Sequence, residues 1–123
     1  MILPINDNQK LSEVIDDFTT LFPYLKLEFF KHKHGLNESN SKKDMLNTEL
    51  TFKKVRRKLN DGALLINENM RVSELEQLFQ DVFGISAQIF RKSGRSWIET
   101  SVTDDWTLKH QNDEGKELSY LSK

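Results

Sequence analysis

Apolar residues recur with a helical period in two separate segments of the chain. They stand at positions 11, 14, 15, 18, 21 and 22 in the first segment, and at 72, 75, 78, 79, 82 and 83 in the second. Because such positions share one side of a helix, both segments are predicted to be amphipathic helices that cover a sheet. Ser73 with Glu76 has the pattern of a capping box, and Ser12 is predicted to cap the first helix. Pro23 and Gly84 follow as residues that end helices.

Short apolar segments on either side of these helices are predicted to be strands. Ile2–Ile5 and Ala63–Ile66 precede the helices and have the composition of buried strands. Segments 25–31 and 85–91 follow the helices and alternate apolar with other residues, which indicates one buried face in each. A turn at residues 93–95 then predicts a hairpin that returns over Ser96–Val102.

The same unit can be recognised twice when the chain is aligned with itself at a shift of 61 residues. Between segments 3–31 and 64–92, ten of 29 positions are identical without a gap, whereas average composition gives about two by chance. The identical pairs are Leu3/Leu64, Ile5/Ile66, Asn6/Asn67, Asn8/Asn69, Ser12/Ser73, Glu13/Glu74, Phe18/Phe79, Phe22/Phe83, Phe29/Phe90 and Lys31/Lys92. We interpret this pattern as the duplication of a structural unit.

One pair conflicts with the alternation of the strands. Phe29 and Phe90 align in sequence but would lie on opposite faces. A bulge, a one-residue slip or a strand buried on both sides would each reconcile them.

The remainder of each unit is less regular. The first contains a polar stretch at 34–43, a weak strand near Met45, and a helix predicted from Phe52, Val55 and Leu59 that ends at residues 60–62. Its counterpart, matched at a shift of 56, is a short helix at Thr107–Gly115. Residues 116–123 are predicted to form a disordered tail.

Together these elements predict a single α+β domain over residues 1–123, with repeats at 1–62 and 63–115. Each repeat would have the order strand–helix–strand–strand–helix. Because apolar helix faces must cover a sheet, the predicted architecture has two layers, a mixed sheet of about six strands with helices on one face. The strand–helix–strand duplication resembles the logic of ferredoxin-like folds, which is an analogy of topology and implies no function.

Composition narrows the class of protein. The 123 residues include no cysteine, and no apolar run approaches the ~20 residues that cross a bilayer. We therefore expect neither a disulfide scaffold nor a membrane protein, and a cytoplasmic location is the default. The net charge is −1, but residues 25–58 hold ten basic and four acidic residues, which leaves a segment of +6. Such asymmetry can mark a surface for an acidic partner.

Catalytic patterns are few. The glycines stand singly and form no phosphate-binding loop, and no serine has the surroundings of a nucleophile elbow. Glu99, Asp104 and Asp105 could pair as acid and base, although acidic residues before a helix are better explained by its dipole.

A metal site is the weaker of the chemical possibilities. His32 and His34 would share one side of an extended strand and could bind a metal with a third ligand such as His110. The lysines beside them disfavour a cation, so we interpret both as solvated residues and predict no metal and no cofactor.

A run of basic residues is the strongest candidate binding surface. On the predicted helix, Lys53, Lys54, Arg56, Arg57 and Lys58 would spread over the outer face, and Arg91, Lys92, Arg95 and Trp97 of the hairpin could extend it. Basic side chains with an aromatic ring can bind phosphates and stack on bases. Because the whole chain is slightly acidic, a solvated helix face is the favoured interpretation.

The sequence therefore favours a non-enzymatic protein-interaction module, which binds a protein partner or associates with itself through an exposed sheet edge or an unused helix face. The alternative is a nucleic-acid-binding protein that uses the basic helix and hairpin. A metal-dependent enzyme at His32 and His34 is the third hypothesis.

Overall fold

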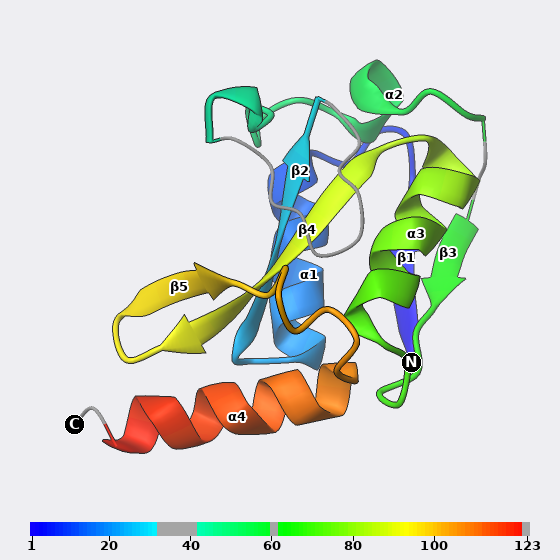
Figure 1. Ribbon diagram of the computed structural model, residues 1–123. Helices are drawn as coiled ribbons and strands as arrows, with labels where there is room; N and C mark the ends of the chain where they lie inside the picture. The colour runs from blue at the N-terminus through cyan, green and yellow to red at the C-terminus, as the bar shows by residue number, and fades with distance from the viewer. Residues whose placement is uncertain (32–41, 60–61, 122–123) are drawn as a thin grey trace.

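The computed structural model of this chain describes residues 1–31, 42–59 and 62–121. Its elements, in chain order, are β1 (Ile2–Ile5), α1 (Leu11–Leu21), β2 (Leu25–Phe30), the 3₁₀ helix η1 (Lys42–Asp44), α2 (Phe52–Val55), β3 (Gly62–Leu65), α3 (Val72–Phe83), β4 (Ser86–Ser93), β5 (Ser96–Glu99) and α4 (Leu108–Leu121). The fold is α+β, as the sequence predicts. Figure 1 shows α1 and α3 against the β2–β4–β5 sheet and α4 across one end of it.

The strands form two antiparallel sheets rather than one mixed sheet of about six strands. One is the β1–β3 ribbon, and the other has the order β2–β4–β5. The expected mixed sheet is wrong because β1 pairs with β3 and β2 with β4, so that within the described residues no strand pairs with a parallel neighbour. The weak strand predicted near Met45 is reduced to a single bridge with Phe30.

The core lies between α1, α3 and one face of the β2–β4–β5 sheet. Leu27 lies opposite Ile89 and Phe29 opposite Ala87, so all four side chains share that face. The ring of Phe29 packs edge-on against Phe79, with ring centroids 5.5 Å apart. The equivalent phenylalanine of α1, Phe18, is fully buried in the same cluster.

The two halves make matched backbone hydrogen bonds. At the start of each helix, Leu11 N–H donates to Leu50 O at 2.9 Å, and Val72 N–H donates to Trp106 O at 3.0 Å. The pattern continues one residue later with Ser12 to Thr48 and Ser73 to Asp104, and also with Phe52 to Gln9 and Leu108 to Met70. The donors and acceptors differ by the shifts of 61 and 56 residues that the sequence contains.

The helix starts lie two residues earlier than predicted. The N-cap residues are Lys10 and Arg71, so Ser12 and Ser73 lie inside the first turns and cap nothing. Instead, the carboxylate of Glu13 accepts a hydrogen bond from the Lys10 N–H at 3.3 Å. Glu74 does the same for Arg71 at 3.1 Å. These glutamates supply the returning half of a capping box.

Glu76, which the sequence assigns to the cap, is buried and binds the sheet instead. Its Oε2 accepts the N–H of Ile89 at 3.0 Å. At the other end of α3, Gly84 has φ 64, a left-handed conformation that favours glycine and ends the helix.

The conflict between Phe29 and Phe90 is resolved by a one-residue slip. Leu27 and Phe29 share the core face with Ala87 and Ile89, so the faces of the two strands agree at a shift of 60, with 27 matching 87 and 29 matching 89, which makes Phe30 the counterpart of Phe90. The cause is a shorter second turn, since Pro23 and Tyr24 precede Leu25, whereas Gly84 alone separates Phe83 from Ile85. Burial on both faces also occurs, since Phe30 is buried on the side opposite Phe29.

Two helices differ from their predicted lengths. The helix expected from Phe52 to Leu59 ends at Val55, because Arg56 turns to extended backbone with ψ 142. The helix expected over Thr107–Gly115 instead continues to Leu121, into the segment predicted to be a disordered tail.

Candidate functional site

The basic residues after α2 act as connectors within the fold. The guanidinium of Arg56 donates from Nε to Asp7 Oδ1 at 2.6 Å and from Nη2 to Asp7 Oδ2 at 2.9 Å. This hydrogen bond and the positive charge of Arg56 hold the pKa of Asp7 below its usual value. Arg56 therefore joins the end of α2 to the turn between β1 and α1.

Arg57 and Lys58 bind the end of α3. Their backbone N–H groups both donate to Phe83 O, at 2.9 and 3.0 Å. The Lys58 ammonium also donates to Asp81 O at 3.1 Å, and the Arg57 guanidinium donates to Lys31 O at 2.8 Å. These bonds satisfy carbonyl oxygens that a helix or strand end leaves without partners.

The basic residues of the hairpin are engaged elsewhere. The Arg91 guanidinium donates to Gln111 Oε1 at 2.9 Å and lies 5.6 Å from the ring centroid of Trp106. The Lys92 ammonium lies 5.8 Å from the ring centroid of Trp97. Arg91 thus helps to attach α4 to the sheet.

The structure places the two parts of the predicted basic surface apart. Arg57 and Lys58 bind Phe83, just before β4 begins at Ser86, whereas Arg91, Lys92 and Arg95 lie at the other end of that strand. Eight residues of strand span about 25 Å. The structure therefore does not bring these residues into one patch, although Lys53, Lys54 and Arg95 are exposed.

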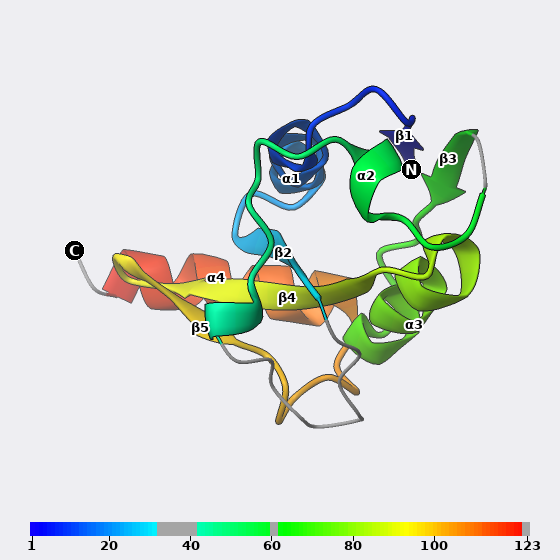
Figure 2. The same ribbon diagram turned by 90° about the horizontal axis from the view of Figure 1, so that it is seen from above.

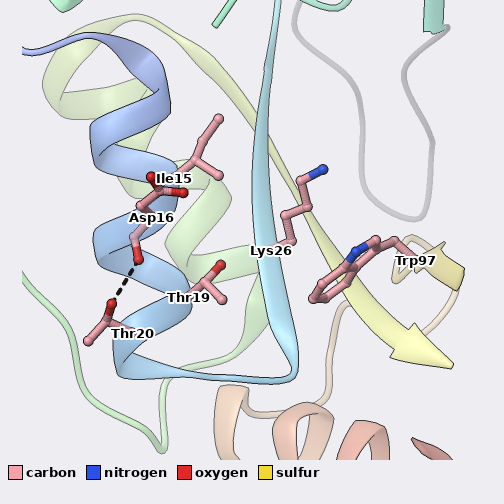
Figure 3. Close-up of a pocket in the computed structure, with 6 residues that line it drawn as sticks. All are labelled: Ile15, Asp16, Thr19, Thr20, Lys26 and Trp97. Carbon is pink, nitrogen blue, oxygen red and sulfur yellow. Dashed lines mark hydrogen bonds between the residues drawn. The ribbon is translucent and has the colours of Figure 1, made fainter. Parts of the chain in front are cut away.

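A shallow groove of about 330 Å³ lies between α1 and the hairpin. It is lined by Ile15, Asp16, Thr19, Thr20, Lys26 and Trp97, which Figure 3 shows from the side. The hydroxyls bond within the fold, Thr19 to Leu25 O and Thr20 to Asp16 O, each at 3.0 Å. The groove is open to solvent and holds no pairing of a nucleophile with a base, so its residues suggest no reaction.

A half-satisfied carboxylate lies beside this groove. Glu28 is 6 % exposed, and its Oε1 lies 2.8 Å from the ammonium of Lys26. Its Oε2 and the nearby Ser86 hydroxyl make no hydrogen bond within the described part of the chain. Most buried polar groups have hydrogen-bond partners, so a buried carboxylate with one free oxygen is unusual. The alternation in the sequence did not distinguish Glu28 from a strand residue that faces solvent.

The residues considered for metal binding form no such site where the structure can be described. His32 and His34 lie outside the described residues, and His110 stacks on Trp106 with ring centroids 4.2 Å apart. Among residues 1–31, 42–59 and 62–121, no group of three potential ligands is arranged to hold a metal ion. Glu99 and Asp105 are exposed, whereas Asp104 is buried and its backbone oxygen binds Ser73.

The most unusual surface is the outer face of the β1–β3 ribbon. The inward side chains Leu3, Ile5, Leu64 and Ile66 are buried in the core. The outward ones, Ile2, Pro4, Ala63 and Leu65, are all exposed and all apolar. Ile2 and Leu65 lie directly opposite each other and are 61 % and 73 % exposed. In a strand with one solvated face, the outward positions are normally polar, so this apolar outward face departs from the pattern of a solvated ribbon.

The outer edge of β3 is open as well. Ile66 N–H donates to Met1 O at 2.8 Å, and hydrogen-bonded pairs alternate along an antiparallel ladder. The N–H and C=O groups of Ala63 and Leu65 therefore point away from β1. No other described strand pairs with that edge, and Figures 1 and 2 both place β3 at the outside of the molecule.

The edge of β1 differs because it carries Pro4. Proline has no backbone N–H, and Pro4 lies opposite Ala63, at a position whose N–H would point away from β3. The ribbon therefore offers β3 as its better pairing edge.

Sequence reasoning missed this surface because it treated both segments as fully buried strands. The available signal was the continuous apolar run in Ile2–Ile5 and Ala63–Ile66. Such a run is typical of a strand covered on both faces, and the structure covers only one.

Scans against protein-family models, curated proteins and solved structures found no match to this chain. In the described residues, no helix has both the length and the apolar character needed to span a membrane.

Proposed function

We propose that this chain is a non-enzymatic protein-interaction module whose docking surface is the ribbon surface, defined as the outward residues Ile2, Pro4, Ala63 and Leu65 with the open edge of β3. The observation that carries the proposal is the coincidence of an apolar face with an edge of the same strand that no other described strand pairs with. Exposed strand edges are templates for pairing with another chain, and exposed apolar patches mark interaction sites.

The chemistry of the ribbon surface selects the kind of partner. Backbone N–H and C=O groups at an edge pair with an extended segment, whereas a helix uses its own backbone groups internally. The outward face has no charged side chain, so the partner segment needs apolar side chains on one side. We therefore propose an extended protein segment with apolar residues at alternate positions.

Nucleic acid fits this surface poorly because phosphates require basic side chains. The alternative hypothesis of nucleic-acid binding depends on the basic segments at 53–58 and 91–95, which lie at opposite ends of β4. It remains a separate prediction.

The scaffold behind the ribbon surface is, we propose, a duplicated unit spanning residues 1–62 and 63–115. The ten identities and the matched hydrogen bonds support this proposal. Duplication would account for the surface, since it brings the first strand of each copy together and gives both the same apolar composition.

A peptide-display library panned on the immobilised protein tests the docking proposal. The selected peptides should have alternating apolar residues, and their binding should fall at least tenfold in Leu65→Lys, which places a charge in the apolar face. Trp97→Lys is the matched control, since it places the same charge in the groove, and it should bind as the original protein does. Peptides that bind Leu65→Lys undiminished, or a failure to select any, would reject the proposal, and so would binding of DNA alone that Lys53→Glu with Lys54→Glu abolishes.

A further inference from the structure

The open edge of β3 is suited to one partner that is present wherever this chain is, namely another copy of itself. Edge pairing of two identical antiparallel strands produces a two-fold contact in which each copy uses the same residues. The outward groups of β3 belong to Ala63 and Leu65, which flank Leu64. When two such edges meet with Leu64 opposite Leu64 of the other copy, Ala63 of each chain faces Leu65 of the other.

This register satisfies all the outward groups of both residues. In an antiparallel ladder the facing residues of a hydrogen-bonded pair exchange both N–H···O bonds. Ala63 would therefore exchange bonds with Leu65 of the second copy, and Leu65 would exchange bonds with Ala63. No other register uses both residues in this reciprocal way.

Side-chain size and charge also agree with pairing between the β3 edges of two identical chains. The small Ala63 would lie beside the large Leu65 of the other copy, so the outward face would remain continuous across four strands. No charged residue stands among Ile2, Pro4, Ala63 and Leu65, so the two outward faces lie side by side in the four-stranded sheet without like-charge repulsion. The net charge of −1 adds little repulsion between whole molecules.

The asymmetry of the ribbon limits the assembly to two copies. Pro4 removes an outward N–H from the β1 edge, whereas β3 keeps both of its outward N–H groups. An assembly that pairs β3 with β3 therefore closes as a dimer, and further copies cannot be added at β1 as favourably.

We infer that two copies of this chain associate through antiparallel pairing of β3 with β3, in the register that places Leu64 opposite Leu64. The inference rests on the proposed function and names the partner of the same surface. The contact is the edge of a four-residue strand, roughly 13 Å long, so the area that it buries falls far below the ~800 Å² per partner of a standard interface. We expect a weak dimer, with a Kd on the order of 100 μM.

Sedimentation equilibrium of the full chain across this concentration range tests the inference. Ala63→Pro removes one outward N–H while it keeps a small apolar side chain, and it should weaken dimerisation at least tenfold. Ala63→Ser is the matched control, since it keeps the N–H, and its Kd should stay within about threefold of the original. A chain that remains monomeric, or a dimer that Ala63→Pro leaves unchanged, would overturn the inference.

Amide hydrogen exchange of the unmodified protein provides a second readout that needs no variant. Exchange of the Ala63 and Leu65 amides should slow as the protein concentration rises, while the amide of Ile2 at the other edge should not change. Equal exchange of Ala63 and Leu65 at low and high concentration would also overturn the inference. If the protein is monomeric but still binds selected peptides through Leu65, the dimer is rejected and the proposed function stands, whereas loss of both results rejects both.

Discussion

Leu3 and Leu64, which are identical in the alignment at a shift of 61, lie directly opposite each other in the β1–β3 ladder. The equivalent positions of the two halves thus meet at the centre of the ribbon. Each places its side chain in the core, and the neighbours on either side, Ile2 with Leu65 and Pro4 with Ala63, face outward in opposed pairs. The ribbon surface is the outer side of this contact between halves.

Truncation of Phe18 and truncation of Phe79 should lower the free energy of unfolding by similar amounts. Phe18 and Phe79 are both fully buried, and removal of a buried phenylalanine side chain costs about 3–5 kcal/mol through lost transfer free energy and a cavity. We therefore expect the free energy of unfolding, measured in urea, to fall by that amount in both Phe18→Ala and Phe79→Ala. A loss below about 1 kcal/mol in either variant would contradict the packing described above.

Substitution of Gly115 should destabilise the protein even though alanine favours a helix. A Cβ at this position would stand 2.9 Å from Tyr24 Cβ and 3.1 Å from Arg91 Cγ, so α4 could not remain as close to the sheet. We expect Gly115→Ala to lose about 1–3 kcal/mol of unfolding free energy, despite a gain of up to ~1 kcal/mol in helix propensity.

Thermal and urea unfolding measure this effect. Lys116→Ala, at the exposed neighbouring position, is the control and should change stability by no more than about 0.5 kcal/mol. A stabilised Gly115→Ala would show that propensity dominates and that α4 is loosely attached.

Local pattern was sufficient to predict much of the fold. The bounds of β1 match the sequence interpretation, and α1 and α3 follow the predicted apolar periods, because each buries one side against the core. The division of the strands into two sheets could not be predicted in this way. Apolar alternation shows that a strand has a buried face, but it does not show which other strand pairs with it.

Long-range contacts explain the remaining differences. The helix of α2 ends at Val55 because the next residue, Arg56, binds Asp7, and Arg57 and Lys58 bind Phe83. These partners lie far away in sequence, so the periodicity of Phe52, Val55 and Leu59 predicted a longer helix. The ribbon surface was missed for a related reason, since a continuous apolar run does not show whether a second layer covers it.

The ion pair of Arg56 with Asp7 should make the free energy of unfolding depend on pH in the acidic range. The pKa of Asp7 is lowered in the folded protein, mainly by the hydrogen bond from Arg56 and also by its charge. The folded state therefore holds its proton less tightly than the unfolded state, so the pair contributes stability above the ordinary value of 3.8, and this contribution is lost as the pH falls through the lowered pKa.

Unfolding free energies measured from pH 7 to pH 2 check this dependence. Arg56→Gln should lose stability at pH 7 and fall less steeply than the original protein below pH 4, because its Asp7 titrates closer to the ordinary value. Asp7→Asn, which removes the titrating group, should flatten the same part of the curve. Parallel curves for all three proteins would contradict the assigned role of the pair.

The two residues of the Lys26–Glu28 pair should respond unequally to substitution. Glu28 is buried and Lys26 is about one-third exposed, so Lys26→Met leaves a buried carboxylate without its counter-charge. We expect Lys26→Met to cost about 1–2 kcal/mol and Glu28→Gln to cost less, because the amide buries no charge.

A double-mutant cycle separates this effect from packing. The variant with both Lys26→Met and Glu28→Gln should recover most of the stability that Lys26→Met loses, since no uncompensated charge remains. Additive losses measured by urea unfolding would show that the carboxylate is adequately solvated without Lys26.

Binding at the β1–β3 ribbon can be tested by mapping the amide chemical shifts of the ¹⁵N-labelled protein while its own concentration, or that of a selected peptide, is raised. Pairing at the edge of β3 predicts the largest changes at Ala63 and Leu65, with none at Trp97 in the groove or at Arg95 in the hairpin. Changes confined to the groove or to the basic segments, with β3 unperturbed, would contradict the claim that this protein binds its partners through the β1–β3 ribbon.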